Sequence, residues 1–364
     1  MKRRQFVGGL AMAAGVAACN GERQSCDGET ASVGTFEWSC VTSWPPKFPG
    51  LGMGPERLAE RIAIASNGRL KIKVYGGGEL VPAFEVFDAV SRGTVEMGHD
   101  ASYYHKGKVD AAQFFTAIPF GMNYTELNGW LYYGGGLELW RELYAPFDLV
   151  PFPCGNTGVQ MGGWFNKEIN SIDDLKGLKM RIPGLGGEVI RRAGATPVTL
   201  PGAEIFTSLQ TGAIDATEWV GPYNDVAFGL HKAAKYYYYP GWQEPGPGLE
   251  TIVNAEAWAS LPADLKAIVE TTCQAIATDM VAEYTFGNAQ ALKQLQENPD
   301  IEIRPFPDDV LVLLRTITNE IVEEMAVKDP AWAKIGESYY AFLEASVENQ
   351  RISEKAYLDT RELK

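Results

Sequence analysis

Residues 81–98 read VPAFEVFDAVSRGTVEMG, and residues 200–217 read LPGAEIFTSLQTGAIDAT. The two stretches align without a gap, with Pro, Glu, Phe and Gly at matching places. Each pattern predicts a turn, a two-turn helix that starts after Pro, a Gly that ends the helix, and a short strand. A further strand pattern precedes each copy, at 70–75 and at 178–182. We therefore predict matching β-α-β units in two α/β lobes, with a cleft between the lobes.

The length and charge of the chain narrow its class. Its 364 residues exceed one ordinary hydrophobic core and fit two lobes. A formal net charge of −14 argues against nucleic acid or an anionic membrane surface as a partner. An anionic ligand would therefore need cations placed locally in the cleft.

The first 19 residues predict an export signal to the periplasm. A basic start at Lys2, Arg3 and Arg4 precedes a small-residue apolar stretch, and the Arg pair resembles a twin-arginine signal. Residues 16–19, VAAC, resemble a bacterial lipobox, so we predict lipidation of Cys19. The alternative is an ordinary cleaved signal with an incidental Cys. Residues 20–34 have the composition of a flexible tether.

Hydrophobic periodicity divides the rest of the chain into two lobes and a helical end. We predict lobe I over 35–155, with part of 245–305 returning to it, and lobe II over 156–245. A return segment and the C-terminal helices then occupy 246–364.

Strands near 155–160 and 240–250 are expected to cross between the lobes and to act as a hinge. The long predicted helices cover 124–143, 263–296, 307–327 and 333–359. The last of these helices either packs across both lobes or contacts a second subunit.

Export would place the cysteines in an oxidising compartment. Their spacing matches no metal site and no CxxC redox motif. Cys40 and Cys154 lie in apolar, strand-like stretches, where they either pair or remain buried free thiols.

Signatures of catalysis are mostly missing. The sequence contains no HExxH, GxSxG or Walker A motif and only three histidines. A binding protein is therefore favoured over an enzyme. An exported enzyme that uses Glu218 or Asp215 as a base stays open as an alternative, as does a lipoprotein that senses a ligand.

Arg181 is the best candidate for binding an anion. It ends the strand pattern LKMRI and precedes a Gly-rich entry to a helix. A guanidinium at this place can hold a carboxylate through two parallel hydrogen bonds, and the helix that starts near Gly186 could add amide donors. The alternative is a surface Arg on an edge strand.

Glu218 ends the second repeat, where strands of open α/β sheets face a ligand crevice. A carboxylate beside Arg181 would repel an anionic ligand unless a cation lay between them. A metal ion held by Glu218 and Gln160, with Glu244 as a further oxygen ligand, would solve this problem. Otherwise, Glu218 is a surface carboxylate paired with Lys or Arg.

Three aromatic residues lie where a pocket wall is expected. Tyr103 and Trp219 follow strands, and Trp242 lies in a Gly/Pro-rich loop. Aromatic walls with a few convergent polar groups are typical of small-molecule pockets.

Several motifs together resemble the solute receptors of TRAP transporters, the tripartite ATP-independent periplasmic systems. The motifs are GEL at 78–80, LKGLKMRIP at 175–183 and LQTGAIDA at 209–216, and the resemblance covers about 36–350. It implies an exported, non-catalytic two-lobed receptor in which Arg181 pairs with a substrate carboxylate. It also implies delivery of the solute to the subunits of a membrane permease.

Within that family, GNTGVQMGGWF at 155–165 and EWVGPYND at 218–225 resemble the α-keto acid-binding branch. This resemblance implies a sodium or calcium ion that bridges protein and substrate carboxylate, with Gln160, Glu218 and the Trp219 carbonyl as ligands. Tyr103 and Asn224 would contact the substrate. The usual signal of this branch is cleaved without lipidation, so Cys19 is a departure from the pattern.

The resemblance implies a small 2-oxo monocarboxylate such as pyruvate as the ligand. The branch is also similar to receptors that bind lactate with calcium, so a 2-hydroxy acid stays open. Receptors of this branch form dimers through a long C-terminal helix, a role that suits 333–359.

Overall fold

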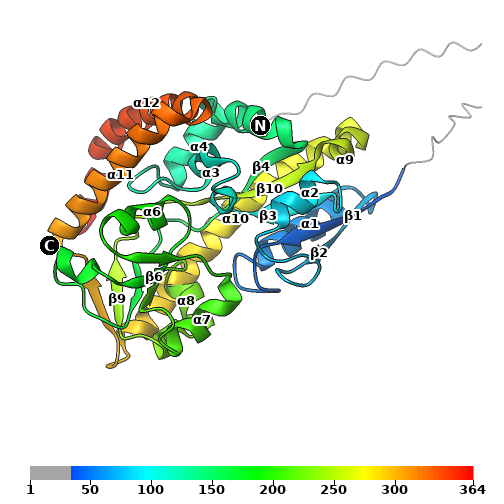
Figure 1. Ribbon diagram of the computed structural model, residues 1–364. Helices are drawn as coiled ribbons and strands as arrows, with labels where there is room; N and C mark the ends of the chain where they lie inside the picture. Colours follow the sequence, from blue (N-terminus) through cyan, green and yellow to red (C-terminus); the bar gives the residue numbers. More distant parts are fainter. Residues whose placement is uncertain (1–33, 364) are drawn as a thin grey trace, which may run out of the picture. The chain divides into compact units, whose positions relative to one another are not determined.

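The computed structural model describes residues 34–363, and residues from Thr35 onward form one compact unit with two β-sheets (Figure 1). The first sheet has the strand order β2-β1-β3-β10-β4. Its strands are β1 (Phe36–Thr42), β2 (Leu70–Tyr75), β3 (Met97–Asp100), β4 (Leu149–Asn156) and β10 (Gly248–Asn254). Strand β1 runs parallel to β2 and β3, whereas β10 runs antiparallel to both β3 and β4.

The second sheet has the strand order β11-β9-β5-β8-β6-β7. Its strands are β5 (Gly163–Phe165), β6 (Lys179–Arg181), β7 (Thr196–Val198), β8 (Ala216–Thr217), β9 (Tyr236–Tyr239) and β11 (Glu302–Pro305). Strand β6 runs parallel to β7 and β8, and β5 runs antiparallel to β8 and β9.

Each sheet contains one β-α-β-α-β unit. The first unit is completed by α1 (Met53–Ala65) and α2 (Val86–Ser91), and the second by α6 (Gly184–Arg192) and α7 (Gly202–Gln210). In both units the second strand lies at one side of the first strand and the third strand at the other. The predicted repeat therefore extends over three strands in each sheet.

One detail of that prediction is wrong. The strand directly before the second repeat is β7, and the pattern at 178–182 forms β6, which corresponds to β1 rather than to β2. Strand β7 is short and contains Pro197, which gives it a weak strand pattern.

After the first unit the chain crosses between the sheets by two short segments, and a third time through the long helix that precedes β11. It leaves β4 of the first sheet and enters β5 of the second, and later leaves β9 and returns in β10. Strands β4 and β10 pair antiparallel, with Asn156 opposite Gly248. The two crossing segments, 157–162 and 240–247, therefore leave the first sheet side by side.

The predicted helix over 124–143 is two helices, α4 (Tyr124–Tyr133) and α5 (Gly136–Tyr144). Gly134 and Gly135 separate them, and Gly135 has a φ of 83°. A left-handed backbone angle ends an α-helix at little cost only when the residue is Gly.

The helical end follows the sequence pattern more closely. Helix α10 (Ala263–Gln296) matches the prediction at both ends, and α11 (Asp308–Lys328) is displaced by one residue. The helix predicted over 333–359 is α12 (Pro330–Ile352) and α13 (Glu354–Arg361), with Ser353 between them. Helices α11 and α12 lie next to each other along one side of the molecule (Figure 1).

The remaining helices are short. They are α3 (Gln113–Thr116), α8 (Pro222–Phe228), α9 (Ala255–Ser260), and the 3₁₀ turns η1 (Ser102–His105), η2 (Asp110–Ala112), η3 (Ala145–Phe147), η4 (Ile172–Leu175) and η5 (Leu230–Lys232). Within residues 34–363, no helix combines the length and the apolar character needed to cross a membrane.

Of the two alternatives for Cys40 and Cys154, a disulfide or buried free thiols, the structure shows the free thiols. Cys40 is in β1 and Cys154 is in β4, with β3 and β10 between them. Three strand spacings amount to roughly 14 Å, beyond the reach of a disulfide. Cys40, Cys154 and Cys273 are all buried free thiols. Cys19 lies outside the described residues.

Candidate ligand-binding site

Arg181 is the last residue of β6, and its side chain is 1% exposed. Its Nε donates to the Leu200 carbonyl at 3.2 Å, and its Nη1 donates to both the carbonyl and a carboxylate oxygen of Glu218. Among residues 34–363, its Nη2 has no hydrogen-bond partner. The guanidinium is therefore fixed at one end and offers a buried donor at the other.

Glu218 directly follows β8, the strand beside β6, and is also 1% exposed. One carboxylate oxygen pairs with Arg181, and the other, Oε2, has no partner in the part of the chain that the structure describes. Burial raises the pKa of Glu218 to about 7, and the charge of Asp225 adds to this effect against the opposing charge of Arg181. The carboxyl group therefore changes its charge near neutral pH.

Gln160 and Glu244 bring further oxygen atoms from the two crossing segments. The backbone N–H of Gln160 donates to the Glu244 carbonyl at 3.2 Å, so the segments are hydrogen-bonded to each other at this point. Gln160 Oε1 and Glu244 Oε2 are buried and have no hydrogen-bond partner from Gly34 to Leu363. Burial and the charge of Glu218 raise the pKa of Glu244 well above its usual range, although Arg181, Tyr103 and Gln160 act in the opposite direction.

Turn η1 brings Tyr103 and Tyr104 to the same place from the first sheet. Burial and the nearby charge of Glu244 raise the pKa of Tyr103 well above its ordinary value. Burial raises the pKa of Tyr104 to about 12, while the charge of Arg181 opposes this shift. The sequence analysis selected Tyr103 but not Tyr104. The one feature of the sequence that could have indicated Tyr104 is its position next to Tyr103.

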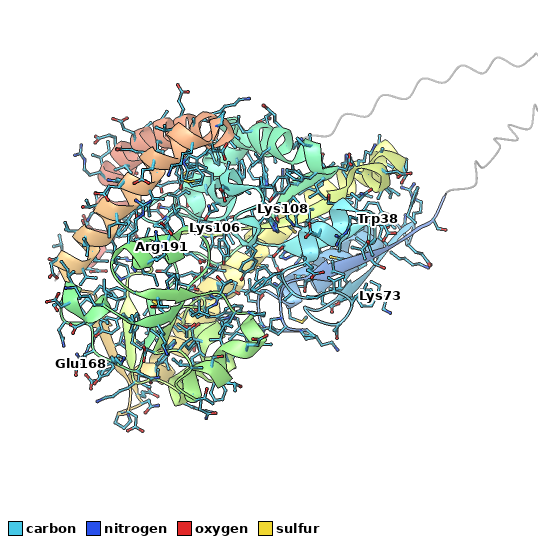
Figure 2. The ribbon with its side chains drawn as sticks, in the orientation of Figure 1. Trp38, Lys73, Lys106, Lys108, Glu168 and Arg191 are labelled. Atoms are coloured by element: carbon cyan, nitrogen blue, oxygen red, sulfur yellow. The ribbon has the colours of Figure 1, made fainter. Side chains whose placement is uncertain are left out.

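Turn η1 also contacts the start of α6. A Cβ on Gly184 would lie 3.3 Å from Tyr103 Cβ. Lys106, which Figure 2 labels, directly follows the turn, and its Nζ donates to the Gly184 carbonyl at 3.3 Å. Helix α6 begins at Gly184, two residues before the predicted start at Gly186. The residues after β3 and after β6 therefore face each other.

The Trp219 ring lies against Arg181 rather than apart from it. Its centroid is 5.3 Å from Arg181 Cζ, within the range of a cation–π contact. Phe48 meets the ring edge-on at 6.2 Å, and a Cβ on Gly202 would lie 2.6 Å from the ring. The ring can therefore occupy this position only because residue 202 has no side chain, and it packs against one side of the guanidinium.

Two residues from the sequence analysis make other contacts. The Asn224 amide donates to the Pro49 carbonyl at 3.0 Å and accepts from the Tyr284 hydroxyl at 2.7 Å. Trp242 stacks on Phe120 with a centroid distance of 5.8 Å. The contacts of Asn224 and Trp242 are therefore with groups other than Arg181 and Glu218.

The site thus combines one cationic donor with three buried oxygens, all of which have no partner within the described residues: Arg181 Nη2, Gln160 Oε1, Glu218 Oε2 and Glu244 Oε2. Buried polar atoms are nearly always hydrogen-bonded, so such a group indicates a place for a polar ligand. Oxygen atoms from carboxylates and an amide are the ligands that hard cations prefer. The donor set fits a sodium or calcium ion beside an anion held by the guanidinium.

The structure has two sheets that are joined by a pair of crossing segments, and the polar group lies where residues from both sheets meet. This arrangement is that of a binding protein for a small solute. The chain belongs to the family described as bacterial extracellular solute-binding protein, family 7 (DctP), whose model matches residues 41–329. The fold is therefore the two-lobed fold of TRAP solute-binding proteins.

Relatives at more than 40% identity cover nearly the whole chain. A monocarboxylate 2-oxoacid-binding periplasmic protein of Nostoc sp. is 44% identical over 358 residues, which is 98% of each chain. A TRAP solute-binding protein of Pseudoalteromonas atlantica, solved with bound sodium and pyruvate, is 45% identical with a TM-score of 0.87 and covers 89% of this chain and 99% of its own. One from Colwellia psychrerythraea, with bound calcium and pyruvate, is 43% identical with a TM-score of 0.87 and covers 90% of this chain and 99% of its own.

Proposed function

We propose that this protein is the receptor of a TRAP transport system for a small 2-oxo monocarboxylate of the pyruvate class. The observation that carries the proposal is the buried group formed by Arg181 Nη2 and three unpaired oxygens. The solved relatives that bind pyruvate together with sodium or calcium support the same ligand and the same pair of ions.

Arg181 would hold the substrate carboxylate through its unpaired donor. Gln160, Glu218 and Glu244, with the Trp219 carbonyl, would hold the metal ion, which supplies positive charge between the acidic side chains and the anion. Tyr103 would contact the substrate from the first lobe, and Asn224 is a weaker candidate because its amide already has two protein partners. A ligand without a carboxylate would leave Arg181 unsatisfied in a desolvated site.

The lobes would close over the ligand by a hinge at the two crossing segments, 157–162 and 240–247. Closure brings η1 to the start of α6, as in the contact between Lys106 and Gly184. Binding without turnover is the role that we propose, so the pyruvate concentration should stay constant on long incubation with the protein.

The first test is isothermal titration of the mature protein with pyruvate, after refolding and dialysis to remove bound solutes. We expect tight binding that depends on added sodium or calcium, and weaker or no binding of lactate. Binding of lactate with calcium, and none of pyruvate, would replace the substrate but keep the site. Absence of binding for all short carboxylates would overturn the proposal.

A matched pair of variants places the ligand at the site. Arg181→Ala should weaken binding by about 2 kcal/mol or more, because a buried charge loses its partner. Arg192→Ala removes an Arg that pairs with Glu188 and Glu324 at the surface, and should leave the affinity unchanged. Equal affinity in both variants would refute the arginine assignment.

The predicted dimer rests on the C-terminal helices. Exposed apolar side chains cluster on this part of the chain: Val347 (50%), Ile352 (76%), Tyr357 (64%) and Leu358 (40%). We propose that they contact a second copy, as apolar surface is covered in oligomers. Light scattering on a chain shortened before Val347, which removes all four side chains, should then report a monomer, and a dimer of unchanged strength would contradict this contact.

Export and anchoring remain proposals for residues outside the described range. We propose that residues 1–19 are the export signal and that Cys19 is the lipidated residue. Mass spectrometry of the protein from membranes should detect a lipidated Cys19, and a soluble mature form that begins after Cys19 would contradict the anchor.

A further inference from the structure

A buried charged cluster lies behind turn η1, outside the group of atoms that would hold the ligand. Asp100 ends β3, His105 ends η1, and Glu250 faces Asp100 from the neighbouring strand β10. The three side chains are at most 3% exposed. None of them was selected from the sequence, since His105 is far from Glu250 along the chain.

Glu250 holds both ends of η1. Its Oε1 lies 3.0 Å from His105 Nε2, and its Oε2 accepts from the hydroxyls of Ser102, at 2.6 Å, and Tyr144, at 3.0 Å. Ser102 is the first residue of the turn and His105 is the last. A 3₁₀ turn of four residues has little stability of its own, so these contacts determine where the turn lies.

Tyr103 lies between these two anchored residues. It is the residue of η1 that meets Gly184 at the start of α6, and its hydroxyl lies near the charge of Glu244. The position of Tyr103 therefore depends on the two anchors that bind Glu250.

The negative charges of Asp100 and Glu250 are offset only when the imidazole of His105 is protonated. Asp100 Oδ1 accepts from Ser43 and from the Ala101 N–H. Its Oδ2 lies 3.6 Å from His105 Nε2 and has no hydrogen-bond partner among the described residues. An imidazolium between two carboxylates offsets their repulsion, and a neutral imidazole does not. The other charged or titratable groups around His105 are Tyr144 on α5 and Lys108, which pairs with Asp88 on α2.

We propose that His105, as an imidazolium held by Glu250 and Asp100, is a positioning residue that fixes η1 and so places Tyr103 against the ligand. This inference rests on the proposed function of the site. It adds a pH-dependent residue that does not touch the ligand.

The direction of the pH effect follows from the contacts. Burial lowers the pKa of His105, but the hydrogen bond to Glu250 and the charges of Asp100 and Glu250 outweigh it and raise the pKa above its ordinary value of 6.5. Burial also raises the pKa of Asp100 to about 7, so the Asp100 carboxylate joins Glu250 in holding the imidazolium only as the pH approaches that value. The stabilising contribution of His105 is thus complete below pH 6.5 and is lost as the pH rises through the raised pKa.

The test is the pyruvate affinity of the wild type, His105→Gln and His231→Gln between about pH 6 and 9, with saturating metal ion. Gln keeps an N–H donor toward Glu250 but does not titrate, and His231 lies on η5, away from the cluster. In the wild type and in His231→Gln, we expect the affinity to fall about tenfold on the alkaline side. In His105→Gln this fall should be absent. A fall of equal size in all three proteins would overturn the proposal.

A double-mutant cycle tests whether His105 acts through Tyr103. The loss caused by His105→Leu at pH 6.5 should shrink to less than half in a Tyr103→Phe background, because the residue it positions has already lost its hydroxyl. Additive losses would indicate a general structural role and would overturn the proposal.

A measurement without ligand separates this inference from the proposed function. Hydrogen exchange of a peptide covering 101–108 should become faster in His105→Gln than in His231→Gln, whether or not pyruvate binds. Equal exchange would refute the positioning role even if pyruvate binds as proposed. One equivalent of transition metal in the wild type, absent in His105→Gln, would also overturn it, because Asp100, His105 and Glu250 would then be metal ligands.

Discussion

The two β-α-β-α-β units share one strand arrangement but differ in the residues at the ends of their strands. In the first sheet, Val41 of β1 lies opposite Gly98 of β3, and in the second, Arg181 of β6 lies opposite Thr217 of β8. Gly98 and Thr217 are the last residues of the aligned repeats. Val41 therefore occupies the place in the first unit that Arg181 occupies in the second.

The next position continues the contrast. One residue beyond the repeats, the first unit has His99 and the second has Glu218. His99 accepts from Trp44 Nε1 at 2.8 Å and contacts the Cys154 carbonyl at 3.0 Å, so both ring nitrogens have protein partners. Glu218 and Arg181 each keep an unpaired atom. At the same backbone positions, the polar atoms of the first unit are hydrogen-bonded within the protein, whereas those of the second unit include atoms that are free to bind a ligand.

The largest expected effect comes from giving the second unit an apolar residue like that of the first. Arg181→Met should reduce pyruvate affinity at least 100-fold, about 3 kcal/mol, and lower stability because Glu218 stays buried without its partner. The double variant Arg181→Met/Glu218→Gln should recover stability but not binding. Calorimetry and thermal unfolding measure the two quantities, and recovered binding in the double variant would show that the arginine is not the anion site.

Glu218→Gln should abolish the response to metal ion and reduce pyruvate affinity by about 2 kcal/mol. In the wild type, metal affinity should rise as the pH increases through about 7, because the pKa of Glu218 is raised to that value and its ionised form binds the cation. Titration with sodium or calcium at several pH values measures this rise. The same pH dependence in Glu218→Gln would assign it to another group.

The corresponding change in the first unit should affect stability alone. His99→Leu leaves the Trp44 N–H buried without an acceptor, which costs about 1–3 kcal/mol. Chemical denaturation measures this loss, and pyruvate affinity should change by less than twofold. A large loss of affinity without a loss of stability would mean that the first unit also contributes to recognition at this position.

The smallest expected effect is at the start of the repeats, where Ala83 of the first corresponds to Gly202 of the second. Gly202→Ala places a methyl group 2.6 Å from the Trp219 ring and should displace the ring from Arg181. We expect about fivefold weaker pyruvate binding, close to 1 kcal/mol. Ala83→Gly is the matched control and should leave affinity unchanged. Unchanged affinity in Gly202→Ala would show that the ring position is not critical.

The sequence predicted those elements whose boundaries are encoded locally. Helix α10 follows Pro262 and stops before Asn298 and Pro299, so both of its ends carry clear signals. Strand β7 has three residues and includes a proline, and the break at Ser353 has no Gly or Pro to indicate it. Such features depend on packing against other parts of the chain.

The site shows the same limit. Arg181 was selected because it ends a strand pattern before a Gly-rich helix entry. Glu218, Tyr103, Gln160 and Glu244 follow a strand or lie in a crossing segment, and the structure brings all five together. Asp100, His105 and Glu250 were missed because β10 returns to pair with β3 only in the folded chain. A register between distant strands is not visible in local periodicity.

The burial of the site also has a kinetic meaning. Arg181, Glu218, Gln160 and Glu244 are at most 5% exposed, so a solute can reach them only when the residues that cover them, such as η1 and the start of α6, move apart. The observed association rate should therefore level off at high pyruvate concentration, at the rate at which the lobes open. Two ligands of very different affinity would then share one limiting rate of entry and differ in how long they stay bound.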